Sequence, residues 1–162
     1  MKNLATSGVV ALSLLGAAFA MTPAFAADEF NVAPGMTYAG APLGLHGADP
    51  VALLDGTQVD GDPQFFAAYD GVAYYFTSEA NKAAFEASPA KYMPQNGGFC
   101  TFGVAFAKKL DGNPEYSAVV DGKLYVFLNG DVLNQFMEDK TGIITKADEN
   151  WVNIRSTAAT DL

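Results

Sequence analysis

Two stretches of the chain share one pattern of hydrophobic and polar positions. Gly61 to Phe85 reads GDPQFFAAYDGVAYYFTSEANKAAF, and Gly112 to Phe136 reads GNPEYSAVVDGKLYVFLNGDVLNQF. They align without a gap at a shift of 51 residues, and an ungapped match that keeps a turn dipeptide is hard to obtain by chance. The pattern therefore predicts a tandem duplication. The identical pairs are Gly61 and Gly112, Pro63 and Pro114, Ala67 and Ala118, Asp70 and Asp121, Gly71 and Gly122, Tyr74 and Tyr125, Phe76 and Phe127, and Phe85 and Phe136.

Each copy reads as a β-hairpin followed by a helix. The dipeptides Asp70-Gly71 and Asp121-Gly122 favour a two-residue type I′ turn, in which both residues have positive φ. Residues 72–76 and 124–128 are rich in aromatic and β-branched side chains, which is typical of strands with a buried face. Each copy is therefore predicted to form two antiparallel strands.

Capping residues mark where the helices begin and end. Residues 77–79 (Thr-Ser-Glu) and 129–131 (Asn-Gly-Asp) offer side-chain oxygens for an N-cap. Ser88-Pro89 ends the first helix and begins a short second one that runs to Tyr92, because proline suits a first helical position. Residues 145–148 are predicted to form a capped final turn leading to Trp151.

One hairpin with one helix cannot bury both of its apolar faces, so the two copies are expected to pack together about a pseudo-twofold axis. The predicted fold class is α+β, with a single compact domain over residues 45–154. The first repeat covers about 46–94 and the second about 97–151. Residues 27–44 are expected to be an extended lead-in and residues 155–162 a flexible tail.

The N-terminal segment has the pattern of a secretory signal peptide. Lys2 is followed by an apolar run, and Ala24-Phe25-Ala26 offers small residues at the two positions that a signal peptidase inspects. The apolar run is shorter than a membrane span requires. We expect cleavage after Ala26, no membrane insertion afterwards, and a periplasmic or secreted protein.

The charge balance narrows the choice of partners. The formal net charge of −9 becomes −10 when residues 1–26 are removed, because that segment holds Lys2 and no acidic residue. An acidic chain repels phosphate backbones, so nucleic acid is not an expected partner. Cys100 is the only cysteine, so no intramolecular disulfide can form and packing must stabilise the fold.

The run from Asp49 to Pro94 begins Asp-Pro-Val and contains YDGVAYYFTSEANKAAFEASPAKY. It resembles the YHS domain. Gly47 to Trp151 is similar to exported bacterial YHS-domain proteins, some of which are described as selenoproteins. The resemblance implies a binding module for a metal ion.

YHS domains of heavy-metal transporters usually carry cysteines at positions where this chain has Ala52, Thr77 and Ala80. A thiolate cluster for copper or zinc is therefore excluded here.

The repeat suggests a different set of metal ligands. At the shift of 51 residues, Asp49 corresponds to Cys100, and His46 is the only histidine. If the two copies face each other, then His46, Asp49 and Cys100, with Met93, form a candidate site for copper or another transition-metal ion. The alternative for His46 is an ordinary loop histidine.

Cys100 lies between two glycine-containing segments, in Gly97-Gly98-Phe99-Cys100-Thr101-Phe102-Gly103. As a reactive thiol it would support a redox function. The alternative is a small buried apolar residue between two phenylalanines.

Aromatic side chains are either core residues or the lining of a pocket for a small organic ligand. No nucleophile elbow, phosphate loop or dinucleotide fingerprint occurs, and no residue is predicted to be catalytic. Three classes remain open, with the first preferred: a non-enzymatic binding module for a metal ion or small ligand, a thiol redox protein, and a structural or interaction protein. The candidate pocket residues are Tyr69, Tyr74, Phe99 and Phe102.

Overall fold

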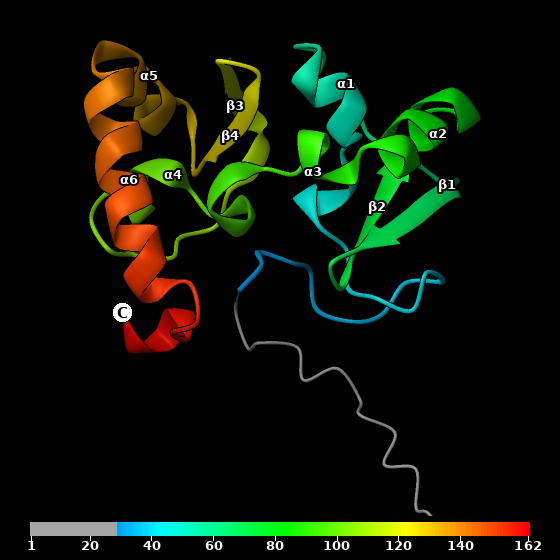
Figure 1. The fold of residues 1–162 in the computed structure, drawn as a ribbon, viewed down its shortest axis with the longest axis horizontal. Helices are drawn as coiled ribbons and strands as arrows, with labels where there is room; N and C mark the ends of the chain where they lie inside the picture. Colours follow the sequence, from blue (N-terminus) through cyan, green and yellow to red (C-terminus); the bar gives the residue numbers. More distant parts are fainter. Residues whose placement is uncertain (1–28) are drawn as a thin grey trace, which may run out of the picture.

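The computed structural model describes residues 29–162 and consists of two units placed side by side (Figure 1). The predicted signal peptide lies outside the described residues. The first unit contains η1 (Leu45–Gly47), α1 (Pro50–Leu54), β1 (Asp62–Tyr69), β2 (Val72–Phe76), α2 (Glu79–Ala87) and α3 (Pro89–Tyr92). The second contains η2 (Gln95–Gly98), α4 (Thr101–Val104), β3 (Asn113–Val120), β4 (Lys123–Phe127), α5 (Gly130–Glu138) and α6 (Lys140–Ile154), followed by η3 (Ala159–Asp161).

The two units have the same element order and register at the shift of 51 residues. β1 pairs antiparallel with β2, and β3 pairs antiparallel with β4, with the irregularity at equivalent places. Leu43 forms a parallel bridge with Ala73, as Pro94 does with Leu124. The α+β class is confirmed, and the two hairpin-and-helix units match in the order and the strand pairing of their elements.

The hairpin turns follow the prediction from the dipeptides. Asp70 and Gly71 have φ of 51° and 80°, and Asp121 and Gly122 have φ of 51° and 72°. Positive φ at both central residues matches the right-handed twist of the flanking strands. These turns fix which side chains of each hairpin face the core.

Each unit has its own aromatic core below its hairpin. In the first unit, Tyr74 and Phe76 pack on Phe85 of α2, with ring centroids 5.3 and 5.1 Å apart from the Phe85 ring. In the second, Phe127 packs on Phe136 of α5 at 4.5 Å. The predicted caps are confirmed, since Ser78 Oγ and Asn129 Oδ1 each accept a hydrogen bond from the backbone N–H three residues later.

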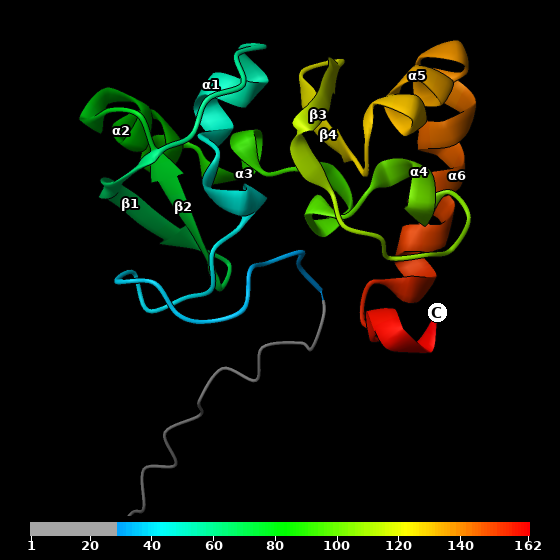
Figure 2. The ribbon, with the colours of Figure 1, turned by 180° about the vertical axis from the view of Figure 1, so that it is seen from behind.

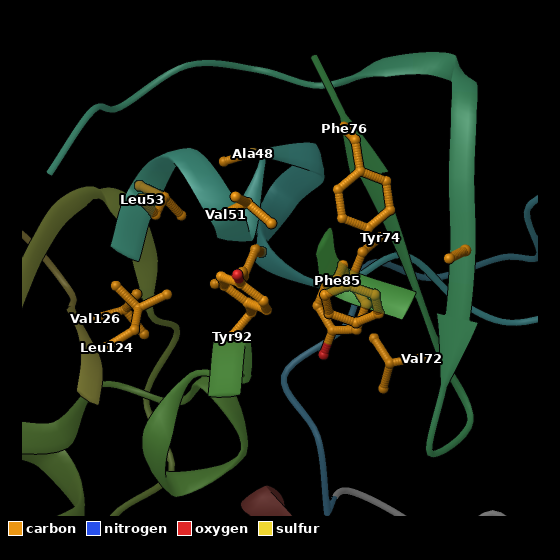
Figure 3. Close-up of a cluster of buried hydrophobic side chains, with 12 residues drawn as sticks. Ala48, Val51, Leu53, Val72, Tyr74, Phe76, Phe85, Tyr92, Leu124 and Val126 are labelled. Atoms are coloured by element: carbon orange, nitrogen blue, oxygen red, sulfur yellow. The ribbon is translucent and has the colours of Figure 1, made fainter. Parts of the chain in front are cut away.

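β4 belongs to both cores, because alternate side chains of a strand point to opposite faces. Tyr125 and Phe127 lie in the second core, whereas Leu124 and Val126 are fully buried in the first. Figure 3 shows Leu124 and Val126 beside Leu53 of α1 and Tyr92 of α3.

The matching face of the first hairpin has a different neighbour. Tyr75 of β2 corresponds to Val126, but it lines an open hollow of about 490 Å³ with Met36, Thr37 and Tyr38 of the lead-in. A twofold axis would give both hairpins the same neighbour. Contacts between the units instead join η1, α1 and α3 of the first unit with β3 and β4 of the second.

The C-terminal helix is longer than the predicted final turn at 145–148. α6 begins at Lys140 because Asp139 accepts a hydrogen bond from the Gly142 N–H at 2.9 Å. It buries Ile143, Ala147 and Ile154 against the second core. The helical spacing of these apolar residues continues through the segment that looked like a turn.

Residues 155–162, predicted to be a flexible tail, are held by a buried lysine. Lys109 Nζ donates to the carbonyl oxygens of Arg155 and Thr157, both at 2.7 Å. The same ammonium group lies over the rings of Phe99 and Trp151, at 5.2 and 5.4 Å from their centroids. Across residues 29–162, none of the helices has the length and apolar character needed to cross a membrane.

Candidate functional site

A polar cluster lies where the two units meet. His46 Nε2 of η1 is 2.9 Å from Oδ1 of Asp111, which precedes β3. Both side chains reach solvent, with 41% of His46 and 51% of Asp111 exposed. The pair is therefore accessible to a ligand.

A left-handed backbone turn delivers His46 to this place. Leu45, His46 and Gly47 have φ of 49°, 50° and 90°. The equivalent turn of the second unit uses Asn96, Gly97 and Gly98. Histidine is one of the side chains more often found at such angles, so the first unit can carry an imidazole where the second carries a glycine.

Two glycines bring backbone carbonyl groups close to Asp111. A Cβ atom at Gly112 would collide with the Gly98 carbonyl oxygen and with Val126, so only glycine allows this approach. Asn31 of the lead-in bridges the resulting oxygen atoms: its Nδ2 lies 2.8 Å from Asp111 Oδ1, 3.1 Å from Gly98 O and 3.4 Å from Gly112 O.

We call the side chains of His46, Asp111 and Asn31, together with the carbonyl oxygens of Gly98 and Gly112, the junction site. Imidazole nitrogen, carboxylate oxygen and carbonyl oxygen are the donor types that borderline cations such as Mn²⁺ and Zn²⁺ accept. Soft Cu⁺ prefers sulfur, which the junction site lacks.

Asp49, a predicted metal ligand, is instead a structural group. It is fully buried and accepts hydrogen bonds from the N–H groups of Val51 and Ala52, from N–H and Oγ1 of Thr77, and from Nδ2 of Asn81, at 2.7 to 3.2 Å. Five donors occupy both of its oxygens. The carboxylate therefore joins the start of α1 to the segment between β2 and α2 and has no free oxygen for a cation.

Cys100 is also buried, with 1% of its surface exposed. Burial raises the pKa of its thiol, although hydrogen bonds from the backbone of Gly103, Leu128 and Phe102 favour the thiolate. A neutral, inaccessible thiol is a poor nucleophile and a poor metal ligand. This environment argues against the redox interpretation and for the small buried residue.

The predicted ligand set of His46, Asp49, Cys100 and Met93 is not brought together. In the part of the chain that the structure describes, no three side chains of the His, Cys, Asp and Glu types lie close enough to hold a metal ion. Asp49 and Cys100 sit in separate units, and Met93 packs against the first core. The expectation failed because the two units do not face each other across a twofold axis.

The candidate pocket residues do not line one pocket. Tyr74 belongs to the first core and Phe99 to the second. Tyr69 is partly exposed, and Phe102 stacks on Phe106 with centroids 5.3 Å apart. The aromatic side chains are thus mainly core, as the alternative interpretation held.

Sequence reasoning missed Asp111 and Asn31. A signal existed for Asp111, because Asp60-Gly61 and Asp111-Gly112 extend the repeat by one residue upstream. Asn31 lies outside the repeat, and no pattern in the sequence singles it out.

The fold and the site define a small α+β protein of two similar units with a polar donor set between them. Residues 48–96, which cover most of the first unit, match the family model of the YHS domain. Comparison with the curated proteins and with the solved structures gave no match.

The YHS domain is regarded as a metal-binding domain. The family's usual cysteine positions do not fit a metal here, since they hold Ala52, Thr77 and Ala80 and two of them donate hydrogen bonds to Asp49. The junction site offers one imidazole, one carboxylate and backbone carbonyl oxygens, which are donor types that divalent cations accept, and it has no thiolate.

Proposed function

We propose that this protein is an exported binding module for a borderline divalent cation, with Mn²⁺ and Zn²⁺ the best matches. The observation that carries the proposal is the solvent-exposed His46–Asp111 pair, whose Nε2 and Oδ1 atoms lie 2.9 Å apart beside two backbone carbonyl oxygens. Imidazole and carboxylate groups in contact can bind one cation together once the imidazole is neutral.

The acidic character of the chain supports the same proposal. A formal charge of −10 after removal of residues 1–26 raises the local concentration of cations at the surface.

Titration calorimetry of the purified protein with MnCl₂ and with ZnCl₂ tests the proposal. We expect single-site binding that falls at least about tenfold in His46→Ala and in Asp111→Asn, since each change removes one ligand. Asp60→Asn is the matched control, because Asp60 holds the position of Asp111 in the first unit. Unchanged affinity in both variants, or no binding by the parent protein, would refute the cation function.

The export part of the proposal rests on Lys2, the apolar run and Ala24 to Ala26. N-terminal sequencing of protein recovered from the periplasmic or secreted fraction should begin at Ala27. A chain that still begins at Met1, or that remains in the cytoplasm, would contradict export without affecting the cation proposal.

The proposed duplication supports the location of the site. The two units have similar folds but contact each other through different surfaces. The η1 turn of the first unit lies against β3 of the second.

A further inference from the structure

The Asn31 amide group lies at the centre of the junction site. Its nitrogen has three oxygen neighbours, Asp111 Oδ1, Gly98 O and Gly112 O, at 2.8, 3.1 and 3.4 Å. An amide nitrogen has only two hydrogens, so the oxygen atoms outnumber the donors. A positively polarised group thus occupies the middle of an oxygen cluster.

A cation attracted to the same oxygen atoms meets the amide as a competitor. The lone pairs of Asp111 Oδ1 already accept from Asn31 and lie 2.9 Å from His46 Nε2. A metal ion placed among these atoms takes the position of the amide hydrogens, because both need the same lone pairs.

Asn31 also attaches the lead-in to the second unit. Its backbone N–H donates to Gly97 O at 2.8 Å, and the next contacts of the segment lie within the first unit or the lead-in itself: Ala33 N–H donates to Leu43 O at 2.8 Å, and Val32 bridges Gly44. Figure 2 shows the lead-in running from the junction of the units to beneath β1 and β2.

A second attachment lies close by and is weaker. Glu29 and Arg155 approach to 3.5 Å, with 27% and 58% of their side chains exposed. Exposed ion pairs of this kind contribute little. The contacts of Asn31 are therefore the main hold of the lead-in on the second unit.

We propose that Asn31 is a latch that competes with the cation, so that cation binding at the junction site releases the lead-in from the second unit. This inference rests on the proposed cation function and adds its regulation. Without metal, the Asn31 amide occupies the oxygen atoms of the junction site. A bound cation displaces the amide from them.

Whether Asn31→Ala raises or lowers the cation affinity tests the latch. Removing the competitor should tighten MnCl₂ or ZnCl₂ binding about fivefold, the net worth of about one hydrogen bond. His46→Ala and Asp111→Asn should weaken it. Thr37→Ala is the control, because it removes a hydrogen bond within the lead-in to Ala41 O, away from the junction site.

Three results are distinguishable. Weaker binding in Asn31→Ala makes the amide a ligand and overturns the latch while leaving the cation function intact. Unchanged binding in Asn31→Ala also overturns the latch. No binding by the parent protein refutes both proposals.

Hydrogen exchange of the unaltered protein gives a second, independent measurement. Saturating MnCl₂ should speed exchange of the Asn31 amide about tenfold, because this N–H donates to the second unit and local opening controls its exchange. The Gly61 amide, which donates to Gly47 O at 2.9 Å in the first unit, serves as the internal reference. Slower exchange at Asn31 with metal would show that the lead-in is tightened, and the latch would be wrong.

Discussion

Asp49 and Cys100 occupy the same position in the two units and accept hydrogen bonds from equivalent backbone groups. Asp49 accepts from the N–H groups two, three and 28 residues further on, and Cys100 accepts from the backbone of Phe102, Gly103 and Leu128, at the same separations. A backbone cage that binds a carboxylate in one unit thus surrounds a thiol in the other.

The side chains around Asp49 are polar, whereas those at the equivalent positions around Cys100 are apolar. Asp49 also receives hydrogen bonds from Thr77 Oγ1 and Asn81 Nδ2. The equivalent positions near Cys100 are Leu128 and Val132. A charged group needs more donors than a thiol, so the second cage is built with apolar neighbours.

The first prediction concerns the stability of these cages. Asp49→Ala should lower the free energy of unfolding by about 3 kcal/mol, because it leaves several buried donors without an acceptor. Cys100→Ala should cost less, about 1 kcal/mol, since it removes a small apolar group and weak sulfur contacts. Urea unfolding followed by circular dichroism measures both. Equal losses would show that the carboxylate cage has no special role.

The second prediction concerns the reactivity of Cys100. Its thiol is buried and has a raised pKa, so the folded protein should react with a thiol reagent such as DTNB at least about a hundredfold more slowly than the urea-unfolded protein at pH 8. Fast labelling of the native state would revive the redox interpretation.

The third prediction concerns alkaline pH. Burial raises the folded-state pKa of Cys100 above its ordinary 9.0, and burial with the nearby Asp70 charge raises that of Tyr74 above its ordinary 10.0. The unfolded chain then loses these protons first, so stability is retained below pH 9 and falls as the pH rises through 9 to 11. Urea midpoints at pH 8, 9.5 and 10.5 measure this fall.

Tyr74→Phe provides the control for that decline. It keeps the ring that packs on Phe85 and removes the hydroxyl that titrates. The decline above pH 10 should become shallower in this variant, and the decline between 9 and 10 should become shallower in Cys100→Ser. A steeper fall in either variant would contradict the assignment.

The fourth prediction concerns the C-terminal segment. Lys109→Met removes the ammonium group that donates to Arg155 O and Thr157 O, and it should cost about 1 to 2 kcal/mol while keeping most of the buried volume. Amides of residues 155–162 should exchange faster, and the fluorescence of Trp151 should change because the ammonium lies over its ring. Lys108→Met, at an exposed neighbouring position, is the control.

The repeated half of the fold could be predicted because its signals are local. Asp70-Gly71 and Asp121-Gly122 specify the turns, and Ser78 and Asn129 specify the helix starts, through contacts within a few residues. How the units pack could not be predicted in the same way, since Leu124 and Val126 look like any buried strand residues until their partners in α1 and α3 are known.

The site was harder to predict than the fold for the same reason. His46 was selected as the only histidine, but its partner Asp111 lies 65 residues away and belongs to the other unit. Asp49 and Cys100 do occupy equivalent positions of the two units. Each is surrounded by backbone donors of its own unit, and the two side chains do not meet at one ligand.

The packing of one unit on the next has a polarity, because helices of the first unit cover the strand face of the second. A contact between two different surfaces of similar units could continue with further copies, so the outer surface at each end must be covered by another segment. The lead-in beside Tyr75 closes one end, and α6 against α4 closes the other. A third copy of residues 46–96 inserted between the units should therefore extend the array without a new kind of interface.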